Sequence, residues 1–378
     1  MSLKRSEPSP LIAYTLMGLR RCYMPEHARW SHKYCFDGRA QPNVSVPASD
    51  LFYSLNVLLA FSRIKALLAP EPYDVAALYG AIATALHAQP VRHYAYATAL
   101  WAGAALDLPV PEPVTRRIRA LTAETSSLSR WTAQDIGMML SGAVAMMRHD
   151  ASWLPLARTL ATVLIKQFMG PKALFFDSGT GARRYFATFA TQVYSVLGLY
   201  HFGEATGDAR ALDAANACVA ALIARQGACG EWPWFHHVPS GRVVDFYEVY
   251  SVHQHGMAPA ILHHAIAHGV PGARAALVKG FDWILGANVL KRSMLRPELH
   301  LIHRSQARAG LAGSRRARMV RSLINVGLGR GDTILPANPG ALQLTPEMRS
   351  YELAWILWSF GGRDDFTELT HRSEFGPV

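Results

Sequence analysis

The feature that most constrains the fold is a succession of helix-like segments, about a dozen in all, none of which alternates as a strand would. After a capping Ser49 or Asp50, apolar residues from Leu51 to Ile64 recur at helical spacing. Each segment is bounded by Pro, Gly, Asp or Ser. Further helices are expected at 73–88, 92–106, 112–124, 132–148, 152–169, 183–206, 211–225, 248–269, 272–289 and 346–360.

The chain of 378 residues has room for one large helical domain or two average ones, and half of its residues are hydrophobic and can form a core. No low-complexity linker marks a boundary. We therefore expect an all-α fold with small hairpin or irregular insertions, in which 1–48 is a lead-in with an N-terminal helix, 49–361 is the domain and 362–378 is a polar tail. A two-layer ring of helical hairpins buries so many amphipathic helices most naturally. The long connections 170–185, 226–247 and 290–345 should gather at its open end.

Cysteine usage favours a reducing compartment. The four cysteines, Cys22, Cys35, Cys218 and Cys229, lack CxxC spacing, which argues against a structural zinc site and a disulfide framework. The apolar run 11–19 is followed by Arg20 and Arg21 where a signal peptide would have small residues. No run is long and uncharged enough to span a bilayer. We expect a cytoplasmic protein.

The stretch 226–264 concentrates residues that carry chemistry, including several of the sixteen histidines. Trp232 and Trp234 flank Pro233, and in extended backbone residues two apart point the same way. Both indoles could therefore line one surface, where the C–H faces of a sugar pack well on aromatic rings. The alternative is that they plug the end of a helical bundle.

A helix is expected to start near Asp245, which can cap it. Its first turns would carry polar side chains on two adjacent faces, and Pro259 should kink it just beyond His255. Polar groups at a helix start beside a kink often point into a cavity. One face would hold Tyr247, Tyr250 and Gln254 with His253 beside them, and the other would hold Glu248, Ser251 and His255.

The formal net charge of +11 is concentrated in one segment. Arginine forks bind carboxylates and phosphates, so this segment could hold an acidic glycan, a diphosphate or a nucleic acid, or it could be a solvated loop. The absence of interleaved aromatic residues argues against nucleic acid. The arginines are Arg304, Arg308, Arg315, Arg316, Arg318, Arg321 and Arg330.

Two tracts carry a family resemblance. Residues 189–227, followed by GEWPW at 230–234, resemble the hairpin unit of the (α/α)-toroid superfamilies. These are the six-hairpin glycosidases, the toroid polysaccharide lyases, the helical domain of glucuronyl C5-epimerases and the terpenoid cyclases. The segment YEVYSVHQHGMAP at 247–259 is similar to the Tyr- and Glu-bearing helix start near the C5-epimerase active site. The resemblance implies a toroid and concerns the fold more than the chemistry.

Three reactions fit the residues to different degrees. Glycoside hydrolysis needs two carboxylates across a cleft, for which Glu231, Asp245, Glu248, Asp177 and Glu347 are candidates. Lyase or epimerase chemistry on a uronic acid needs a base and cations that hold the enolate, which the Tyr and His residues and Arg304 could supply.

A terpenoid cyclase is the third possibility. Gln226, Gly230 and Trp232 reproduce the spacing of the QW repeat by which such cyclases resemble one another. The DxDD acid motif is absent, and Asp364-Asp365 is a poor substitute. The spacing could equally be a helix-end lock in which the glutamine caps a backbone group and the tryptophan packs beneath it.

These observations favour an enzyme of the lyase or epimerase type that acts on an acidic poly- or oligosaccharide, with a non-catalytic glycan-binding toroid as the remaining alternative. No metal or cofactor is required; His263, His264 and His268 are better explained by an exposed helix face. The oligomeric state stays open. The predicted catalytic residues are Tyr250, His253, His255, Tyr247, Glu248 and Glu231, and the predicted substrate-binding residues are Trp232, Trp234, His236, Gln254 and Arg304. We expect them to converge on an open mouth of the ring.

Overall fold

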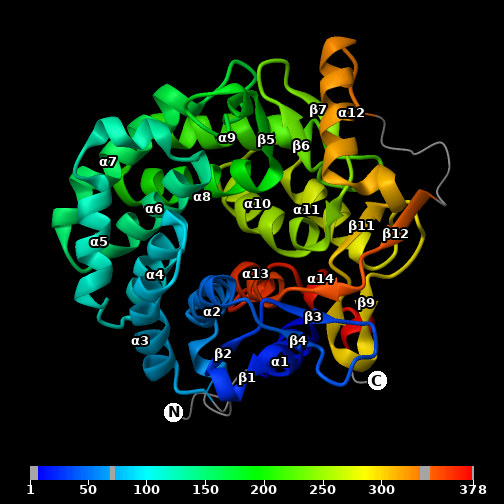
Figure 1. Cartoon of the computed structure of the whole chain (residues 1–378), viewed down its shortest axis with the longest axis horizontal. Helices are drawn as coiled ribbons and strands as arrows, with labels where there is room; N and C mark the ends of the chain where they lie inside the picture. The colour runs from blue at the N-terminus through cyan, green and yellow to red at the C-terminus, as the bar shows by residue number, and fades with distance from the viewer. Residues whose placement is uncertain (1–6, 69–72, 333–340, 377–378) are drawn as a thin grey trace.

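The computed structural model describes residues 7–68, 73–332 and 341–376, over which twelve helices form two concentric rings (Figure 1). The inner ring is α2 (Pro47–Phe61), α4 (His93–Leu106), α6 (Ala133–Met146), α8 (Phe189–Thr206), α10 (Ala258–Ala267) and α13 (Ser350–Phe360). The outer ring is α1 (Pro10–Cys22), α3 (Val75–Ala85), α5 (Glu112–Thr122), α7 (Leu154–Val163), α9 (Ala209–Ile223) and α11 (Ala273–Ile284).

The inner ring is closed. Consecutive inner helices pack on one another from α2 to α13, and α13 returns to pack on α2. Each outer helix packs on one inner helix: α1 on α13, α3 on α2, α5 on α4, α7 on α6, α9 on α8 and α11 on α10. The predicted all-α toroid of helical hairpins is therefore confirmed.

Burial explains why the two rings have different sequences. Most residues of α4 and α8 are buried, since each inner helix has neighbours on both flanks and an outer helix behind it. The outer helix α5 buries only Val114 and Ile118 and exposes a polar face.

Two glycines let α6 and α8 touch through their backbones. A Cβ at Gly137 would lie 2.4 Å from the carbonyl oxygen of Tyr194, and a Cβ at Gly198 would lie 2.6 Å from the carbonyl oxygen of Gly137. Real side chains do not fit at such distances, so this contact requires glycine on both helices.

The long connections all precede inner helices and therefore gather where those helices begin. Three of the small antiparallel sheets lie there, with strand orders β5-β6-β7, β12-β11-β8 and β13-β3-β4. Their strands are β3 (Lys33–Cys35), β4 (Asn43–Val44), β5 (Phe186–Thr188), β6 (Phe235–His237), β7 (Arg242–Asp245), β8 (Val249–Tyr250), β11 (Ser305–Arg308), β12 (Leu342–Leu344) and β13 (Glu347–Met348). Two two-stranded sheets pair β1 (Tyr23–Met24) with β2 (Arg29–Trp30) and β9 (Leu295–Arg296) with β10 (Leu301–Ile302).

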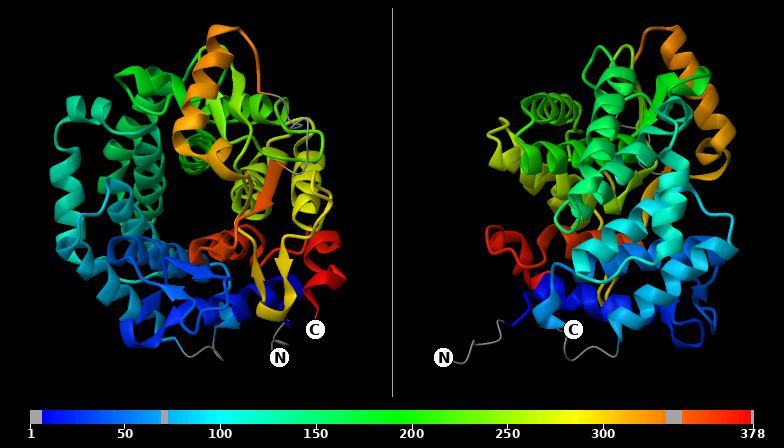
Figure 2. Two further views of the ribbon diagram at one scale, coloured as in Figure 1. Left: turned by 45° about the vertical axis from the view of Figure 1, so that its right-hand side comes forward. Right: turned by 90° about the vertical axis from the view of Figure 1, so that its left-hand side faces the viewer.

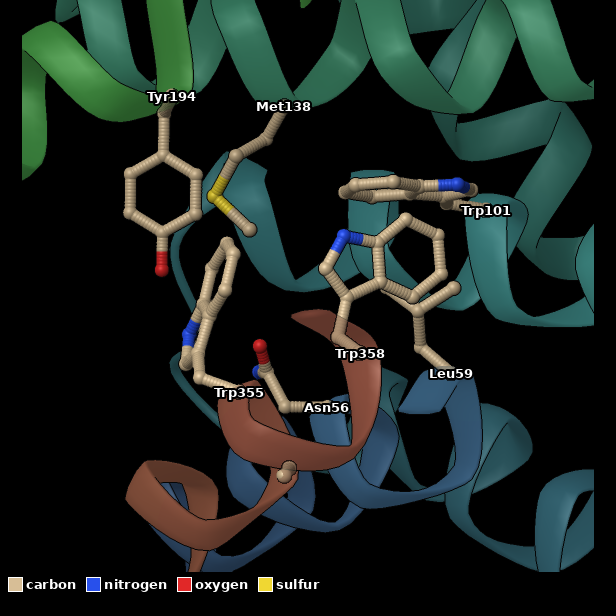
Figure 3. Close-up of a pocket in the computed structure, with 8 residues that line it drawn as sticks. Asn56, Leu59, Trp101, Met138, Tyr194, Trp355 and Trp358 are labelled. Atoms are coloured by element: carbon tan, nitrogen blue, oxygen red, sulfur yellow. The ribbon is translucent and has the colours of Figure 1, made fainter. Parts of the chain in front are cut away.

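Side chains from five inner helices fill the centre of the ring (Figure 3). The cavity left between them is about 10 Å³, room for roughly one water molecule. Trp101 and Trp358 also line a depression of about 450 Å³ where the inner helices end. The central side chains are Asn56, Leu59, Trp101, Met138, Tyr194, Ala354, Trp355 and Trp358.

The helix expected to start near Asp245 was predicted wrongly. Asp245 ends β7, which pairs with β6, and Tyr250 lies in β8, which pairs with β11. The backbone groups that a helix would use are therefore bonded to strands. Helical structure begins only after Tyr250 and runs from Ser251 through a π-helical turn over His253–Met257 into α10 without a break. Pro259, which cannot donate to the preceding turn, closely follows this π-helical turn.

The other expected helices agree with the structure to within a few residues, except that 183–188 forms a 3₁₀ turn and β5. The segment for which a solvated loop was the alternative contains α12 (Arg315–Gly327). The described parts of the lead-in and tail supply α1 and α14 (Thr367–Thr370), which pack on each other.

The four cysteines are free thiols in the structure. Within the described ranges, no helix combines the length and the apolar composition that crossing a bilayer needs.

Replacing Gly137 with Ala is expected to lower the free energy of unfolding by about 1–3 kcal/mol, because the new methyl group overlaps the α8 backbone. Gly80→Ala in α3 is the matched control, since a Cβ there meets nothing within 4 Å. The control should be neutral or stabilise the protein by up to about 1 kcal/mol. Denaturant unfolding measures both, and equal stability of the two variants would contradict the close α6–α8 contact.

Candidate active site

The candidate site lies where inner helices begin and centres on three rings from the stretch singled out in the sequence. The ring centroids of Trp234 and Tyr250 are 4.9 Å apart, those of Tyr250 and His253 5.3 Å, and those of Trp234 and His253 5.7 Å. Strand β8 and the π-helical turn position Tyr250 and His253. Trp234 is partly exposed, so this cluster reaches the surface.

Tyr250 belongs to a hydrogen-bonded group around Glu248. Its hydroxyl donates to Glu248 Oε2 at 2.8 Å, and Ser305 Oγ donates to Glu248 Oε1 at 2.6 Å. Arg318 adds an ion pair to Glu248 at 3.3 Å. Burial and then the nearby Glu248 carboxylate raise the pKa of Tyr250 to about 12, so the phenol keeps its proton at neutral pH.

Arg304 connects this group to the start of α13. Its guanidinium carbon lies 5.1 Å from the centroid of the Tyr250 ring, and its Nη1 lies 2.7 Å from Glu347 Oε1. Glu347 also binds Lys33 at 3.0 Å and Arg349 at 3.4 Å. The result is a continuous charged network between β3, β11, β13 and α13.

Glu352 is the carboxyl group at the centre of this network. Its side chain is 2 % exposed, and Oε2 accepts the backbone N–H of Arg349 at 3.4 Å in the first turn of α13. Burial raises its pKa to about 7, and this rise persists although Arg304 and Arg349 favour the carboxylate. A carboxyl group with this pKa can both give and take a proton at neutral pH.

Three buried polar atoms around Glu352 have no hydrogen-bond partner in the described protein: Glu352 Oε1, Arg304 Nε and Arg349 Nε. Glu352 Oε1 and Arg304 Nε are 3.9 Å apart, too far for a direct hydrogen bond. Buried polar groups are normally satisfied, so these atoms are suited to a polar ligand or to water.

Partly exposed aromatic rings extend the site across α2 and α13. His32 stacks on Tyr53 with centroids 5.3 Å apart, and Tyr53 lies 4.5 Å from Tyr351. Arg349 donates to the Tyr53 hydroxyl at 2.9 Å. The site therefore combines acid–base groups, cations and flat apolar faces.

Of the predicted site residues, Tyr250, His253, Glu248, Trp234 and Arg304 come together here. Burial lowers the pKa of His253 to about 3, assisted by His255 and Arg304, so its imidazole is neutral at pH 7. A neutral imidazole can accept or donate a hydrogen bond, but it is not the acid of this site.

The other six predicted residues lie in the interior and do not line an open surface, which corrects the expected convergence. Trp232 is 1 % exposed and stacks near Phe189, and Glu231 accepts the backbone N–H of Cys229 at 3.0 Å. The physical reason is packing against other elements: the π-helical turn that carries Gln254 and His255 packs on α11 and α13, and Trp232 packs on Phe189 and beside Gly280 of α11. Only His236 lies in a strand, β6. The six are Glu231, Trp232, His236, Tyr247, Gln254 and His255.

The Gln226–Gly230–Trp232 spacing is a helix-end lock. Gln226 Nε2 donates to the carbonyl oxygens of Gly230 at 3.0 Å and Ala276 at 2.9 Å, while Trp232 is buried beside Gly280. These contacts tie the end of α9 to α11. They account for the spacing without cyclase chemistry.

The arginine-rich segment converges on the site, but most of its charge is paired. Arg308 binds Asp332 at 3.0 Å, Arg318 binds Glu248, and Arg321 binds Asp245 at 3.1 Å. Arg316 and Arg330 are exposed, and the side chain of Arg315 lies outside the description. The arginines therefore balance the site carboxylates rather than forming an open cationic patch.

Sequence reasoning missed His32, Tyr53, Arg349, Tyr351 and Glu352. His32 lies in the lead-in, for which the sequence predicts irregular structure, and Glu352 and Arg349 lie in the last predicted helix. One signal was available: an acidic residue in the first turn of a helix, which favours the helix start. Burial of that carboxyl group depends on ring closure, which the sequence does not display.

No protein-family model and no curated protein sequence matches the chain. Solved structures do match. A cellobiose 2-epimerase from Bacillus thermoamylovorans is 10% identical with a TM-score of 0.62, over 92% of this chain and 97% of that chain. An α-1,6-mannanase from a Salegentibacter species is 10% identical with a TM-score of 0.54, over 93% and 98% of the two chains.

An unsaturated glucuronyl hydrolase from a Bacillus species is 13% identical with a TM-score of 0.56, over 92% and 94% of the chains. The chain thus has the (α/α)6 toroid fold found in sugar epimerases and glycoside hydrolases, along nearly its whole length. At this identity the likeness concerns the fold.

Glu352→Gln is expected to remove a pH-dependent loss of stability. The pKa of Glu352 in the folded protein, about 7, exceeds the ordinary 4.5, so the protonated carboxyl group stabilises the fold. This stabilisation is complete below pH 4.5 and is lost as the pH rises through 7. Glutamine does not ionise. The variant should therefore gain stability relative to the unaltered protein between these pH values, by up to about 3 kcal/mol at ~1.4 kcal/mol per pKa unit.

Glu347→Gln is the control of opposite sign. Burial opposes ionisation of Glu347, but the Lys33 and Arg304 contacts outweigh it and lower its pKa, so its carboxylate stabilises the fold above the ordinary value and loses this effect as the pH falls. Its variant should be less stable near neutrality and approach the unaltered protein in acid. Thermal unfolding over a pH series measures both, and parallel curves for the two variants would contradict the assignment.

Proposed function

We propose that the protein is a carbohydrate-processing enzyme that moves a proton on an acidic sugar, by chemistry of the lyase or epimerase type. The observation that carries this proposal is Glu352, a carboxyl group with a pKa of about 7 that lies between Arg304 and Arg349. Around it lie the unsatisfied guanidinium nitrogens and the aromatic rim. The toroid fold shared with sugar epimerases supports the same conclusion.

Glu352 would act as the general base or acid at the sugar carbon. Removing a proton next to a carbonyl or carboxylate places negative charge on oxygen, and that charge must be stabilised. The guanidinium groups of Arg304 and Arg349 would supply this stabilisation. Both are cations at any pH in the working range, and each has an Nε–H that no acceptor among the described residues satisfies.

Tyr250 would act as a hydrogen-bond donor and proton shuttle. Its phenol keeps its proton, with a pKa of about 12, and already donates to Glu248. Glu248 would in turn orient the phenol. The neutral imidazole of His253, packed beside both Tyr250 and Trp234, would hold the tyrosine in place.

The substrate would be held by its flat faces as much as by its charge. Trp234, Tyr53 and Tyr351 offer partly exposed rings on which a sugar can stack. The cations exceed the carboxylates only slightly, which suits a substrate with one carboxylate better than a densely charged polymer. The cations are Lys33, Arg304, Arg308, Arg318, Arg321 and Arg349, and the carboxyl groups are Asp245, Glu248, Asp332, Glu347 and Glu352.

Glycoside hydrolysis is the second candidate. It needs one protonated and one ionised carboxyl group, and Glu352 with its raised pKa and Glu347 with its lowered pKa meet that requirement. The same residues would then act as acid and base across a glycosidic bond.

Solvent-isotope exchange separates these reactions. Uronate-containing and neutral oligosaccharides are incubated with the protein in D₂O and followed by proton NMR, beside assays for reducing ends and for the ultraviolet absorbance of an unsaturated product. The proposal predicts deuterium at a ring carbon of the sugar if the reaction is an epimerisation, or the ultraviolet absorbance of an unsaturated product if it is an elimination. New reducing ends with neither carbon-bound deuterium nor an unsaturated product would instead establish the hydrolase, and binding without any turnover would establish a glycan-binding toroid.

In the same assay, Glu352→Gln is expected to lower kcat/KM by about 10²–10⁴-fold, the usual contribution of general acid–base catalysis. Tyr250→Phe and His253→Ala are expected to abolish measurable turnover while the helical circular-dichroism spectrum is unchanged. Tyr200→Phe is the matched control, because its hydroxyl binds Asn216 between α8 and α9 at 2.8 Å. Near-normal turnover in the Glu352, Tyr250 and His253 variants would rule out the proposed centre.

A further inference from the structure

Helix α12 is amphipathic with its polar side turned toward the protein. Arg318 and Arg321 on this side bind Glu248 and Asp245, and Asn325 Nδ2 donates to the carbonyl oxygen of Val244 at 3.1 Å. The helix therefore packs on β7 through hydrogen bonds and ion pairs. A surface helix normally packs through its apolar side instead.

The apolar side of α12 faces solvent. Its large side chains are 53–60 % exposed, and Leu311 nearby is 89 % exposed. The other exposed large apolar side chains among the described residues, Met17, Val46 and Tyr185, are only 41–45 % exposed and lie far apart in sequence. We call Met319, Val320, Leu323, Ile324 and Leu328 the α12 apolar face. A contiguous apolar surface of this kind marks a contact with another body.

The surroundings of the α12 apolar face are convex and basic. The helix projects from the rim of the ring (Figures 1 and 2), so it offers a ridge rather than a groove. Arg316 and Arg330 are exposed beside it, and residues 299–331 contain neither Asp nor Glu. The formal net charge of the chain is +11.

We propose that the α12 apolar face docks on an anionic lipid surface, as a peripheral contact that inserts one side of the helix between the headgroups. A basic helix with one apolar side binds in this way, because apolar burial and attraction to anionic lipids act together. A second copy of the chain fits less well. A two-fold contact through α12 would bring Arg316 and Arg330 toward their own counterparts, and like charges repel.

Docking would also place the candidate active site close to the lipid surface, since Arg318 and Arg321 on the opposite side of α12 hold two of its carboxylates. Binding of the α12 apolar face to lipid does not depend on the proposed catalytic activity. Burying the exposed half of a large apolar side chain strengthens partitioning by roughly fivefold. Five such residues and two arginines therefore give a reversible association rather than a permanent anchor.

Vesicle co-sedimentation of the full chain tests the proposal. The vesicles are phosphatidylcholine alone and phosphatidylcholine mixed with phosphatidylglycerol. The protein should sediment with the mixed vesicles, less with the neutral ones, and progressively less as salt is added. The double variant Leu323→Ser, Ile324→Ser should reduce the partition coefficient by roughly 25-fold, two losses of about fivefold each.

The matched control is the double variant Met17→Ser, Val46→Ser, which removes two apolar side chains of comparable exposure, 41 % and 42 %, away from α12. It should bind vesicles as the unaltered protein does. Circular dichroism and thermal unfolding establish that both variants are folded. In a second readout, the emission of Leu323→Trp should shift to the blue when mixed vesicles are added, beyond any shift in the unaltered protein.

Three results would overturn the proposal. The first is no sedimentation with mixed vesicles, and the second is unchanged binding of the Leu323, Ile324 variant. The third is a concentration-dependent dimer, measured by light scattering, that the same substitutions convert to monomer; the α12 apolar face would then be an interface between two copies.

Discussion

Closure of the inner ring between α2 and α13 is the constraint on which the candidate site depends. It brings residues near 30–55 against residues near 350, and hydrogen bonds fix the junction: Ser350 Oγ donates to the carbonyl oxygen of Ser31, and Arg349 donates to Tyr53. Strand β13 pairs with β3 across the same junction. Without this closure Glu352 would be exposed at an ordinary helix start, and its pKa would not be raised by burial.

The periodicity of the sequence was enough to predict the fold, because helical spacing is a local property. Each helix of a hairpin is indicated by its own apolar stripe and its own capping residues. The Trp234, Tyr250 and His253 cluster was accessible for the same reason, since its members lie within twenty residues. Glu352 and Tyr53 were not accessible, because their environment is built by contacts across some three hundred residues. The burial of Trp232 and His255 was not accessible either, because Trp232 packs on Phe189 of α8 and the π-helical turn that carries His255 packs on α11 and α13.

The pairing of the charged residues also depends on contacts between segments that are distant in sequence. A run of arginines with no acidic residue suggests an open cationic surface, yet their partners, Asp245, Glu248 and Glu347, come from other loops. Among the described residues of this segment, the large side chains that face solvent are apolar, apart from Arg316 and Arg330. A sequence shows which residues a helix carries, but the loops it packs on decide which side of the helix turns outward.

The tryptophan-filled centre of the ring limits how the proposed glycan substrate could bind. With only about 10 Å³ left between Trp101, Trp355 and their neighbours, the centre of the ring is closed to a glycan chain. A chain that enters from the loop-bearing face must leave by that face. Under the proposed function, a closed ring suits a terminal sugar or a short oligosaccharide, because a polymer could not pass through the centre while its units were processed in turn.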